Sequence, residues 1–489
     1  MSLPYLGLGL SSNAQQSDAP HPYRLLEHQK GAFDFLEYSA PLDFEQARVE
    51  ATLLPQMLAQ REQLPLLYHP VHLNLWGPVV ESAERLAMLA SHLAAVGSPW
   101  VSNDVGWWHC EGKALPGYLY LTPPLDAHGL QNAAAHARTV RDAVGVPLLL
   151  ENPAVMTARG EWHVLDFMER LSTHTGCDLL LDAGHLFSHQ LARGLSLTEG
   201  LEAFPFERVV EVHVAGGVVT RRGARLVYVD DHPQPIRDEV WSLLETILPR
   251  CTRLRALTYE GDGHPMALAS LNLQRLRALL PAARAEASSE PLPAATPTTA
   301  AVLEGWRLFD DVHQGVCAED PEGARAELDY RLAVMAQTLD AAVPLTRLAV
   351  APTRAALAAF AGGEAFRAWF EHGARELTDA FTAWAMREAR SPALQGAEAL
   401  VSLEAWAQHA ARRLAPGTAM NASFPVCLTE ALHAARALQR HLGARAWWSE
   451  EGVETSGLEG LFQATRRARP GPWAVALRRV GARVEITEA

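Results

Sequence analysis

The sequence predicts an α/β protein, in which a (β/α)8 TIM barrel is followed by a mainly α-helical region with a candidate terminal β-hairpin. Eight short apolar runs alternate with segments of helical period before residue 280. A stretch rich in Pro, Ser, Thr and Ala then interrupts the pattern, and the rest of the chain is rich in Ala, Leu and Arg with a helical period. Repeated β-α units of this number and length are typical of a barrel, and a doubly wound open sheet is the alternative.

The strand candidates are short apolar runs that alternate with segments of helical period. They occupy residues 4–10, 33–38, 64–69, 100–104, 146–152, 178–184, 209–216 and 255–261. Between most of them lie longer segments, such as SAERLAMLASHLAAV and WHVLDFMERLSTHT, whose apolar residues recur every three or four positions. That spacing predicts helices that bury one face against a sheet.

The chain is expected to divide at residues 285–300, where AEASSEPLPAATPTTA lacks apolar periodicity and indicates an extended linker. Residues 1–284 would form a metal-binding barrel domain, and residues 301–489 a mainly helical domain. At the end of the chain, WAVALRRVGARVEIT places two apolar runs on either side of Gly481, which predicts the hairpin.

Composition disfavours several classes of protein. The 489 residues include 42 Lys plus Arg and 56 Asp plus Glu, and the resulting net charge of −14 repels nucleic-acid phosphates. No run approaches the roughly 18 apolar residues of a membrane span. Five cysteines lie far apart without a C-x-x-C pair, and the N-terminus lacks the basic start of a signal peptide. We therefore expect a cytoplasmic protein with no nucleic-acid or membrane partner.

Acidic and histidine side chains end or follow the predicted strands. Barrel enzymes build their active sites at the carboxyl ends of the strands, so we expect these side chains to meet at one end of the barrel. The set comprises His69, Asp104, Glu151, Asp182, His185, His213, Asp230, His232 and Glu260. Taken singly, a histidine in an apolar strand is more often a hydrogen-bonded core residue than a metal ligand.

A metal centre explains the set as a whole. Burial of Glu151 or Asp182 without a partner is costly, and the strand runs contain no Lys and only Arg255 to neutralise such acids. Histidine and carboxylate ligands without cysteine suit iron, manganese or zinc. Nine ligands exceed the needs of one ion, so two or three ions are predicted, with a carboxylate such as Glu151 as a bridge. Glu211 shares a strand face with His213, and it would either orient that ligand or form a core hydrogen bond.

A series of motifs runs in order along residues 4–280. They are GLGLSS, FLEYSA, YHPVHLNL, VSND, LPG followed by PPL, LLLEN, EW ahead of a helix, TGCDLLLDAGHL, EVHVAGG, VDDHPQPIRDEVW and TYEGD. In this order they resemble the multinuclear non-heme iron-dependent oxidases, a family that modifies ribosomally made peptides. The resemblance implies a TIM barrel of the xylose-isomerase and endonuclease IV type, which agrees with the strand count.

The resemblance also implies how the ligands are shared among the ions. The first ion would be held by the catalytic residues Glu151, Asp182, His213 and Glu260, the second by His69 and the shared Glu151, and the third by His185, Asp230 and His232. One position departs from the family, because Ser102-Asn103-Asp104 stands where S-E-H or S-D-H is usual. Asp104 would bind through oxygen and make the second ion harder, or the second site would be weak or empty. His72 and His109 lie near enough in the sequence to be substitutes.

Cofactors, substrate and partners follow from the same resemblance. The cofactors would be two or three iron ions in a mixed Fe(II)/Fe(III) state, with O2 as co-substrate. The substrate would be a precursor peptide, modified at a Cys, Asp or Asn side chain. The C-terminal domain would replace the separate partner protein that recruits the peptide, or it would only cover the barrel or mediate dimerisation. Trp107 and Trp108 would form a wall beside the peptide or pack under a loop.

Three other functions fit parts of the pattern. A metal-dependent hydrolase or endonuclease would use the same ligands to activate water, but the charge of −14 disfavours a DNA substrate. A sugar isomerase on the same scaffold typically needs a lysine, and Lys30 and Lys113 are poorly placed for that role. A barrel that only binds peptide would explain Asp104 as a lost ligand, but the other eight ligand positions are retained.

Overall fold

The computed structural model describes residues 3–13, 16–39, 53–71, 73–280, 299–373, 376–391, 394, 397–412, 419–434, 461, 464, 469–480 and 483–488. Contacts divide the chain into two compact units. The barrel unit contains Met1–Ala114 and Tyr118–Glu327, and the C-terminal unit contains Leu115–Gly117 and Leu328–Ala489. Among the described residues, no helix combines the length and the apolar character that a membrane span requires.

Eight parallel strands close into a barrel, each at a position that the sequence predicted. In order around the barrel they are β1 (Gly7–Ser12), β2 (Phe35–Tyr38), β3 (Leu66–Tyr68), β4 (Val101–Asp104), β7 (Leu148–Glu151), β8 (Asp178–Asp182), β9 (Val209–Ala215) and β12 (Ala256–Glu260). Closure follows from β1, which pairs with β2 at Gly9↔Phe35 and with β12 at Gly7↔Ala256. The barrel is therefore confirmed and the open sheet is excluded.

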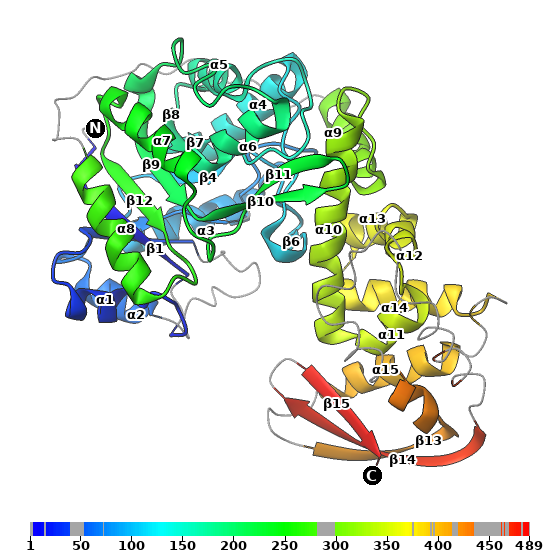
Figure 1. Cartoon of the computed structure of the whole chain (residues 1–489). Coiled ribbons are helices and arrows are strands. Elements are labelled where there is room, and N and C mark those ends of the chain that lie inside the picture. Colours follow the sequence, from blue (N-terminus) through cyan, green and yellow to red (C-terminus); the bar gives the residue numbers. More distant parts are fainter. Residues whose placement is uncertain are drawn as a thin grey trace. The chain divides into compact units, whose positions relative to one another are not determined.

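Helices alternate with the barrel strands along the chain (Figure 1). They are α1 (Pro22–His28), α2 (Leu54–Gln60), α3 (Ala83–Val96), α4 (Ala127–Val144), α5 (Val164–Thr175), α6 (Ala183–Arg193), α7 (Asp238–Ile247) and α8 (Met266–Leu279). Local sequence sets several of their ends. The Ser82 hydroxyl accepts a hydrogen bond from the Arg85 N–H at the start of α3. Helices α3 and α6 end at Gly97 and Gly194, whose positive φ angles suit glycine.

Short elements extend the barrel loops. They are β5 (His109–Cys110), β6 (Lys113–Ala114), η2 (Pro116–Tyr118), η3 (Phe206–Arg208), β10 (Gly217–Arg222), β11 (Arg225–Asp230) and η4 (Leu248–Arg250). The antiparallel β10–β11 hairpin directly follows β9 and was not predicted. Its second strand ends at Asp230, so this hairpin carries one of the predicted metal ligands to the barrel.

The barrel interior has two chemically different layers. The apolar layer consists of Phe35, Leu67, Trp100, Leu149, Leu180, Val210 and Ala256. Two residues further along six of these strand segments, the polar layer begins with Glu37, His69, Ser102, Glu151, Asp182 and Thr258. Both sets point inward because side chains alternate between the faces of a strand. In β9 the pairing with β8 shifts between Leu179 and Leu180, and this irregularity lets Glu211 and His213 join the polar layer.

Helix α9 (Thr299–Gln314) belongs to the barrel unit by its contacts. The Trp306 ring packs edge-on against Trp107, with 4.9 Å between ring centroids. At the start of α10 (Pro321–Ala342), the Glu327 carboxylate accepts hydrogen bonds from Thr157 Oγ1 at 2.6 Å and from Arg159 Nη1 at 2.7 Å. The contacts thus divide the chain after Glu327, whereas the expected linker at 285–300 lies mostly outside the described residues.

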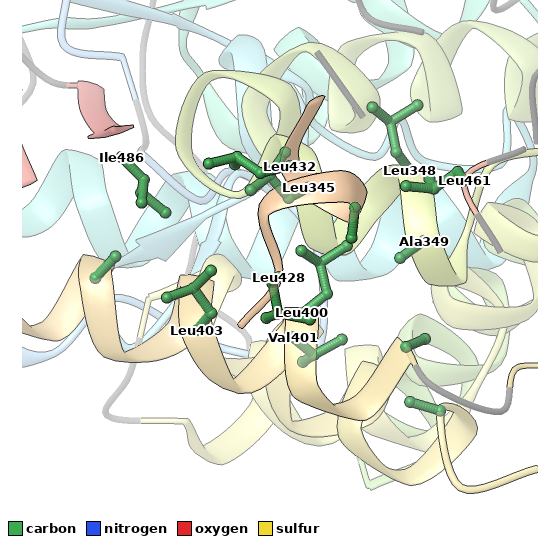
Figure 2. Packing of buried hydrophobic residues seen from close by; sticks show 14 of the residues in the cluster. Leu345, Leu348, Ala349, Leu400, Val401, Leu403, Leu428, Leu432, Leu461 and Ile486 are labelled. Atoms are coloured by element: carbon green, nitrogen blue, oxygen red, sulfur yellow. The ribbon is translucent and has the colours of Figure 1, made fainter. Parts of the chain in front are cut away.

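The C-terminal unit combines helices with a small sheet. After the remainder of α10 come α11 (Pro344–Val350), α12 (Arg354–Ala361), α13 (Glu364–His372), α14 (Leu377–Glu388), α15 (Ala397–Ala411), β13 (Ala419–Cys427), β14 (Arg469–Val480) and β15 (Arg483–Glu488). Figure 2 shows the core of this unit, in which leucines of α11, such as Leu345 and Leu348, gather with Leu400 of α15.

The predicted terminal hairpin is confirmed. Strands β14 and β15 pair antiparallel from Val480↔Arg483 onward, and Gly481 between them lies outside the described residues. The sequence did not predict β13, which pairs with the other side of β14. Because the two strands are separated by a long stretch of chain, no local pattern indicates that pairing.

Candidate metal centre

The nine predicted ligands meet at the carboxyl ends of the barrel strands. Four of them are the last residues of barrel strands, namely Asp104, Glu151, Asp182 and Glu260. His69 directly follows β3, His213 lies within β9, and His185 lies in the first turn of α6. Asp230 ends β11, and His232 follows it by two residues. Parallel strands place their carboxyl ends at the same end of a barrel, which is why residues so far apart in sequence converge.

A first group contains His213, Asp182 and Glu260, whose ligand atoms lie within 4.8 Å of one another. His213 Nδ1 is 3.6 Å from Glu260 Oε2 and 3.7 Å from Glu151 Oε1. The structure therefore brings together all four residues that the resemblance assigns to the first ion.

A second group contains His69, Asp104 and Glu151. His69 Nε2 is 3.6 Å from Glu151 Oε2, the oxygen other than the one that faces His213. The pairing of β4 with β7 sets Asp104 beside Glu151. Glu151 thus offers one oxygen to each of the first two groups, as a bridging carboxylate would.

The carboxylate of Asp104 is held in place by a tyrosine. Tyr120 Oη donates to Asp104 Oδ1 at 3.1 Å, because the same oxygen accepts the Ala154 N–H at 2.9 Å and its own hydrogen is left for the carboxylate. The Tyr120 ring stacks on Trp108 at 4.2 Å between centroids. Trp108 and Trp107 are both buried, so they pack inside the protein and do not form an exposed wall.

A third group is centred on Asp230. Its Oδ2 atom lies 3.3 Å from His185 Nε2 and 3.2 Å from His232 Nε2. His185 Nδ1 also lies 3.5 Å from Glu151 Oε1 and 3.3 Å from Asp104 Oδ1, which connects this group to the second.

Each of the four histidines uses its second ring nitrogen for a partner in the protein. The pairs are His69 Nδ1 with Ser102 Oγ at 3.0 Å, His185 Nδ1 with the Asn152 carbonyl at 2.9 Å, His213 Nε2 with Glu37 Oε2 at 3.3 Å and His232 Nδ1 with Asp262 Oδ2 at 3.2 Å. Metal-binding histidines usually have such a partner, which fixes the tautomer and the orientation of the ring. The remaining nitrogen of each ring faces the acids of the cluster.

Several of these hydrogen-bond partners were not predicted from the sequence. Glu37 is fully buried on β2, two residues after the inward-facing Phe35, so strand periodicity alone indicated an inward position. Asp262 follows Glu260 by two residues, and Asn13 Nδ2 donates to its second oxygen at 3.2 Å.

The two histidines named as substitute ligands do not join the cluster. His109 Nε2 lies 2.9 Å from Glu81 Oε1, and His109 Nδ1 accepts the Gly112 N–H at 3.2 Å. Both ring nitrogens of His109 are therefore engaged away from the cluster, one by Glu81 ahead of α3 and the other within its own loop. His72 lies outside the described residues.

Burial and crowding shift the pKa values of the cluster. Burial, reinforced by Asp104, raises the pKa of Glu151 well above its ordinary value. Burial also raises the pKa of Asp104 to about 6, although His185 opposes the change. For His213, burial alone would lower the pKa, but the carboxylates of Glu37 and Glu260 raise it well above 6.5. The charges of Glu151 and Asp104 are thus incompletely compensated by the protein, whereas His232 and His185 lower the pKa of Asp230.

The donor set fits metal ions. Within the described residues, the ion pairs of the cluster acids are all with histidines, and none is with Lys or Arg. Several buried atoms also lack a hydrogen-bond partner there, including Glu151 Oε2, Asp182 Oδ2, His213 Nδ1 and Asp230 Oδ1. Cations bound at these atoms would neutralise the acids and replace the missing hydrogen bonds.

Comparison with known proteins finds relatives of the barrel region. A family model described as "RiPP precursor modification enzyme MbnB/TglH/ChrH" matches residues 7–280. A UPF0276 protein of Caulobacter vibrioides (strain NA1000 / CB15N) is 28% identical over 280 residues, which cover 56% of this chain and 95% of that protein. A UPF0276 protein of Rhizobium meliloti (strain 1021) is 30% identical over 208 residues, or 42% of this chain and 67% of that protein.

Solved structures with a likeness to the barrel include L-ribulose 3-epimerase, at 16% identity and a TM-score of 0.36 over 57% of this chain and 95% of that one. A xylose isomerase domain protein from Salmonella typhimurium is 12% identical with a TM-score of 0.37, over 57% of this chain and 99% of that one. The match of the family model covers more than half of the chain and includes every residue of the cluster. This chain belongs to the MbnB/TglH/ChrH family of enzymes that modify RiPP precursors, the ribosomally synthesised and post-translationally modified peptides.

Proposed function

We propose that the protein is an iron- and O2-dependent oxidase that modifies a precursor peptide at a Cys side chain, or at an Asp or Asn side chain. The observation that carries the proposal is the buried cluster, in which four histidines and five predicted acids converge without a Lys or Arg ion partner among the described residues. Family membership supplies the peptide substrate, and the motif resemblance supplies iron and O2.

The three groups would each hold one ion. Glu151, Asp182, His213 and Glu260 would hold the first, His69, Asp104 and Glu151 the second, and His185, Asp230 and His232 the third. Bound iron would supply electron transfer to O2 and a Lewis acid for the substrate atom. Glu151 would bridge the first two ions, since its Oε1 and Oε2 atoms face different histidines.

The protein exposes one side of the cluster to solvent and buries the other side. Side-chain exposure is 27% for His232 and 22% for Asp230, but only 2% for Glu151. A peptide would therefore approach from the third group, while the bridging carboxylate stays out of water. Exclusion of water at Glu151 strengthens its electrostatic interactions with bound ions.

The test is incubation of the iron-loaded full chain with the short peptide encoded beside its gene, with and without O2, read by mass spectrometry. We expect a mass change that requires both iron and O2. An unchanged peptide with a fully iron-loaded enzyme would contradict the proposal. A mass change that needs zinc and proceeds without O2 would favour the metal-dependent hydrolase instead, because the same ligands suit activation of water.

We also propose that the C-terminal region recruits the peptide in cis. In the β13-β14-β15 sheet, β13 and β15 are the outer strands, and an extended peptide can add a strand to the edge of a sheet. A chain that ends after Ala342 keeps α9 and all of α10, so it retains the barrel contacts of Trp306 and Glu327. We expect this truncated protein to bind metal normally and to lose peptide affinity, whereas unchanged affinity would leave the region a covering or dimerising role.

A further inference from the structure

We propose that Glu37 is the residue that positions His213 for the first metal ion. The inference rests on the proposed metal centre, and no sequence motif or family description assigned a role to this glutamate. Glu37 accepts the hydrogen of His213 Nε2 and thereby leaves Nδ1 as the free ligand nitrogen. Glu37 is thus a positioning residue that acts through the histidine.

The two faces of the His213 ring have different surroundings. Nε2 lies 3.2 Å from Glu37 Oε1 and 3.3 Å from Glu37 Oε2. Nδ1 makes no hydrogen bond within the described protein and faces Glu260 and Glu151, at 3.6 and 3.7 Å. A histidine with one nitrogen on a carboxylate and the other among candidate ligands has the arrangement that fixes a tautomer for metal binding.

Glu211 is the other acid near this ring, but its oxygens already have partners. Glu211 Oε2 accepts from Trp100 Nε1 at 2.8 Å, and Oε1 accepts from Thr258 Oγ1 at 3.0 Å. Its nearest oxygen is 3.5 Å from His213 Nε2, outside the hydrogen-bond geometry that Glu37 satisfies. Glu211 therefore mainly forms hydrogen bonds in the core, and Glu37 is the acid that orients the His213 ring.

A direct metal-ligand role for Glu37 fits the geometry less well. Glu37, His69 and His213 have ligand atoms close enough to hold an ion. Such an ion would have to use Nε2 of His213, the nitrogen turned away from Glu260 and Glu151. Only the Nδ1 side joins His213 to the acids of the first group, so Glu37 lies behind the ring.

The position of Glu37 explains why no local sequence pattern links it to His213. Glu37 lies on β2 and His213 on β9, and β1 and β12 separate these strands around the barrel. The contact crosses the barrel interior and joins residues 176 positions apart in the sequence. Phe35 below Glu37 belongs to the apolar layer, which holds β2 in place and leaves Glu37 at the base of the polar layer.

The test is Co(II) titration of the metal-free full-length chain, because Co(II) reports affinity and coordination by its visible spectrum without any oxidation step. We expect Glu37→Gln to weaken the binding of one Co(II) ion by about 10- to 100-fold, the range found when the hydrogen-bond partner of a metal-bound histidine is removed. The number of Co(II) bound at saturation should stay unchanged. Glu211→Gln, the matched control on the same ring, should change every affinity by less than about threefold.

A second readout is the paramagnetically shifted, solvent-exchangeable N–H signal of the His213 ring in the Co(II)-loaded protein. Glu37→Gln should shift this signal and speed its exchange with solvent, whereas Glu211→Gln should leave it in place. Glu37→Asp keeps the charge but moves it away from the ring, so its Co(II) affinity should be intermediate. Thermal unfolding of each metal-free variant checks that the barrel is intact.

Three results would overturn the inference. Unchanged Co(II) affinity in folded Glu37→Gln would make Glu37 a core acid only. Loss of one Co(II) at saturation would make it a ligand. An equal effect of Glu211→Gln would show that negative charge near the ring, and not the hydrogen bond of Glu37, determines the Co(II) affinity. Because Co(II) binding needs neither O2 nor peptide, failure of the oxidase proposal would leave these outcomes readable.

Discussion

The apolar and polar layers of the barrel interior stand two residues apart on the same strands, yet they have opposite effects on the metal-free fold. The apolar layer, with residues such as Trp100 and Leu149, gains free energy from burial. The polar layer buries acids such as Glu151, whose raised pKa shows that its charge is poorly compensated by the protein. The apolar layer therefore stabilises the strands, whereas the polar layer lowers the stability of the metal-free barrel and supplies the candidate ligands.

The largest expected effect comes from removing a ligand in the polar layer. His213→Ala or Glu260→Ala should abolish turnover, because each removes a donor that the first ion requires. Peptide conversion by mass spectrometry and bound metal per chain measure the effect. His174→Ala, an exposed histidine at the end of α5, is the matched control and should keep full activity. Substantial turnover by either ligand variant would remove the first group from the catalytic centre.

A truncation in the apolar layer should act on stability instead. Leu149→Ala removes a fully buried side chain and should lower the free energy of unfolding by about 2–5 kcal/mol through lost burial and a residual cavity. Urea denaturation measures the loss, and Co(II) affinity of the folded protein should change little. A large loss of metal affinity without loss of stability would show that the two layers are not separable.

The pH dependence of the metal-free protein should distinguish the layers further. The pKa of Asp104 is raised from 3.8 to about 6 in the fold, so ionised Asp104 destabilises the fold above pH 6, and protonation removes this effect as the pH falls toward 4. Asp104→Asn should therefore gain stability over the unaltered protein as pH rises from 4 to 6, by up to about 3 kcal/mol.

Thermal unfolding of both metal-free proteins across this range measures the difference. With metal bound the order should reverse, because an amide is the weaker ligand. A constant difference between the two metal-free proteins from pH 4 to 8 would contradict the shifted pKa.

The smallest effect is expected for Asp104→His. This change introduces the histidine that is usual at this position in the non-heme iron oxidases that the motifs resemble. Turnover should be preserved, since His69 and Glu151 still define the second group. Peptide conversion and metal content, compared with those of the unaltered protein, are the measurements. Complete loss of activity would show that the oxygen ligand and its bond to Tyr120 have a role of their own.

The sequence by itself determined the eight barrel strands and the nine candidate ligands. Both are local signals: an apolar run such as LLLE is short enough for a strand, and an acid at its carboxyl end is too costly to bury without a function. The parallel barrel then brings those ends together, so the ligands on barrel strands followed from the strand count, whereas Asp230 and His232 reach the cluster through the β10–β11 hairpin that was not predicted.

Only the tertiary structure decided which nitrogen of each histidine is free and what holds it. Glu37 reaches His213 across the barrel interior, Tyr120 meets Asp104 from a loop, and Trp306 of α9 packs on Trp107. Each contact joins residues whose own surroundings in sequence contain no trace of the partner, because hydrogen bonds and ring packing depend on distances of a few ångströms that periodicity does not encode. The same reason hid β13, whose partner strand lies far along the chain.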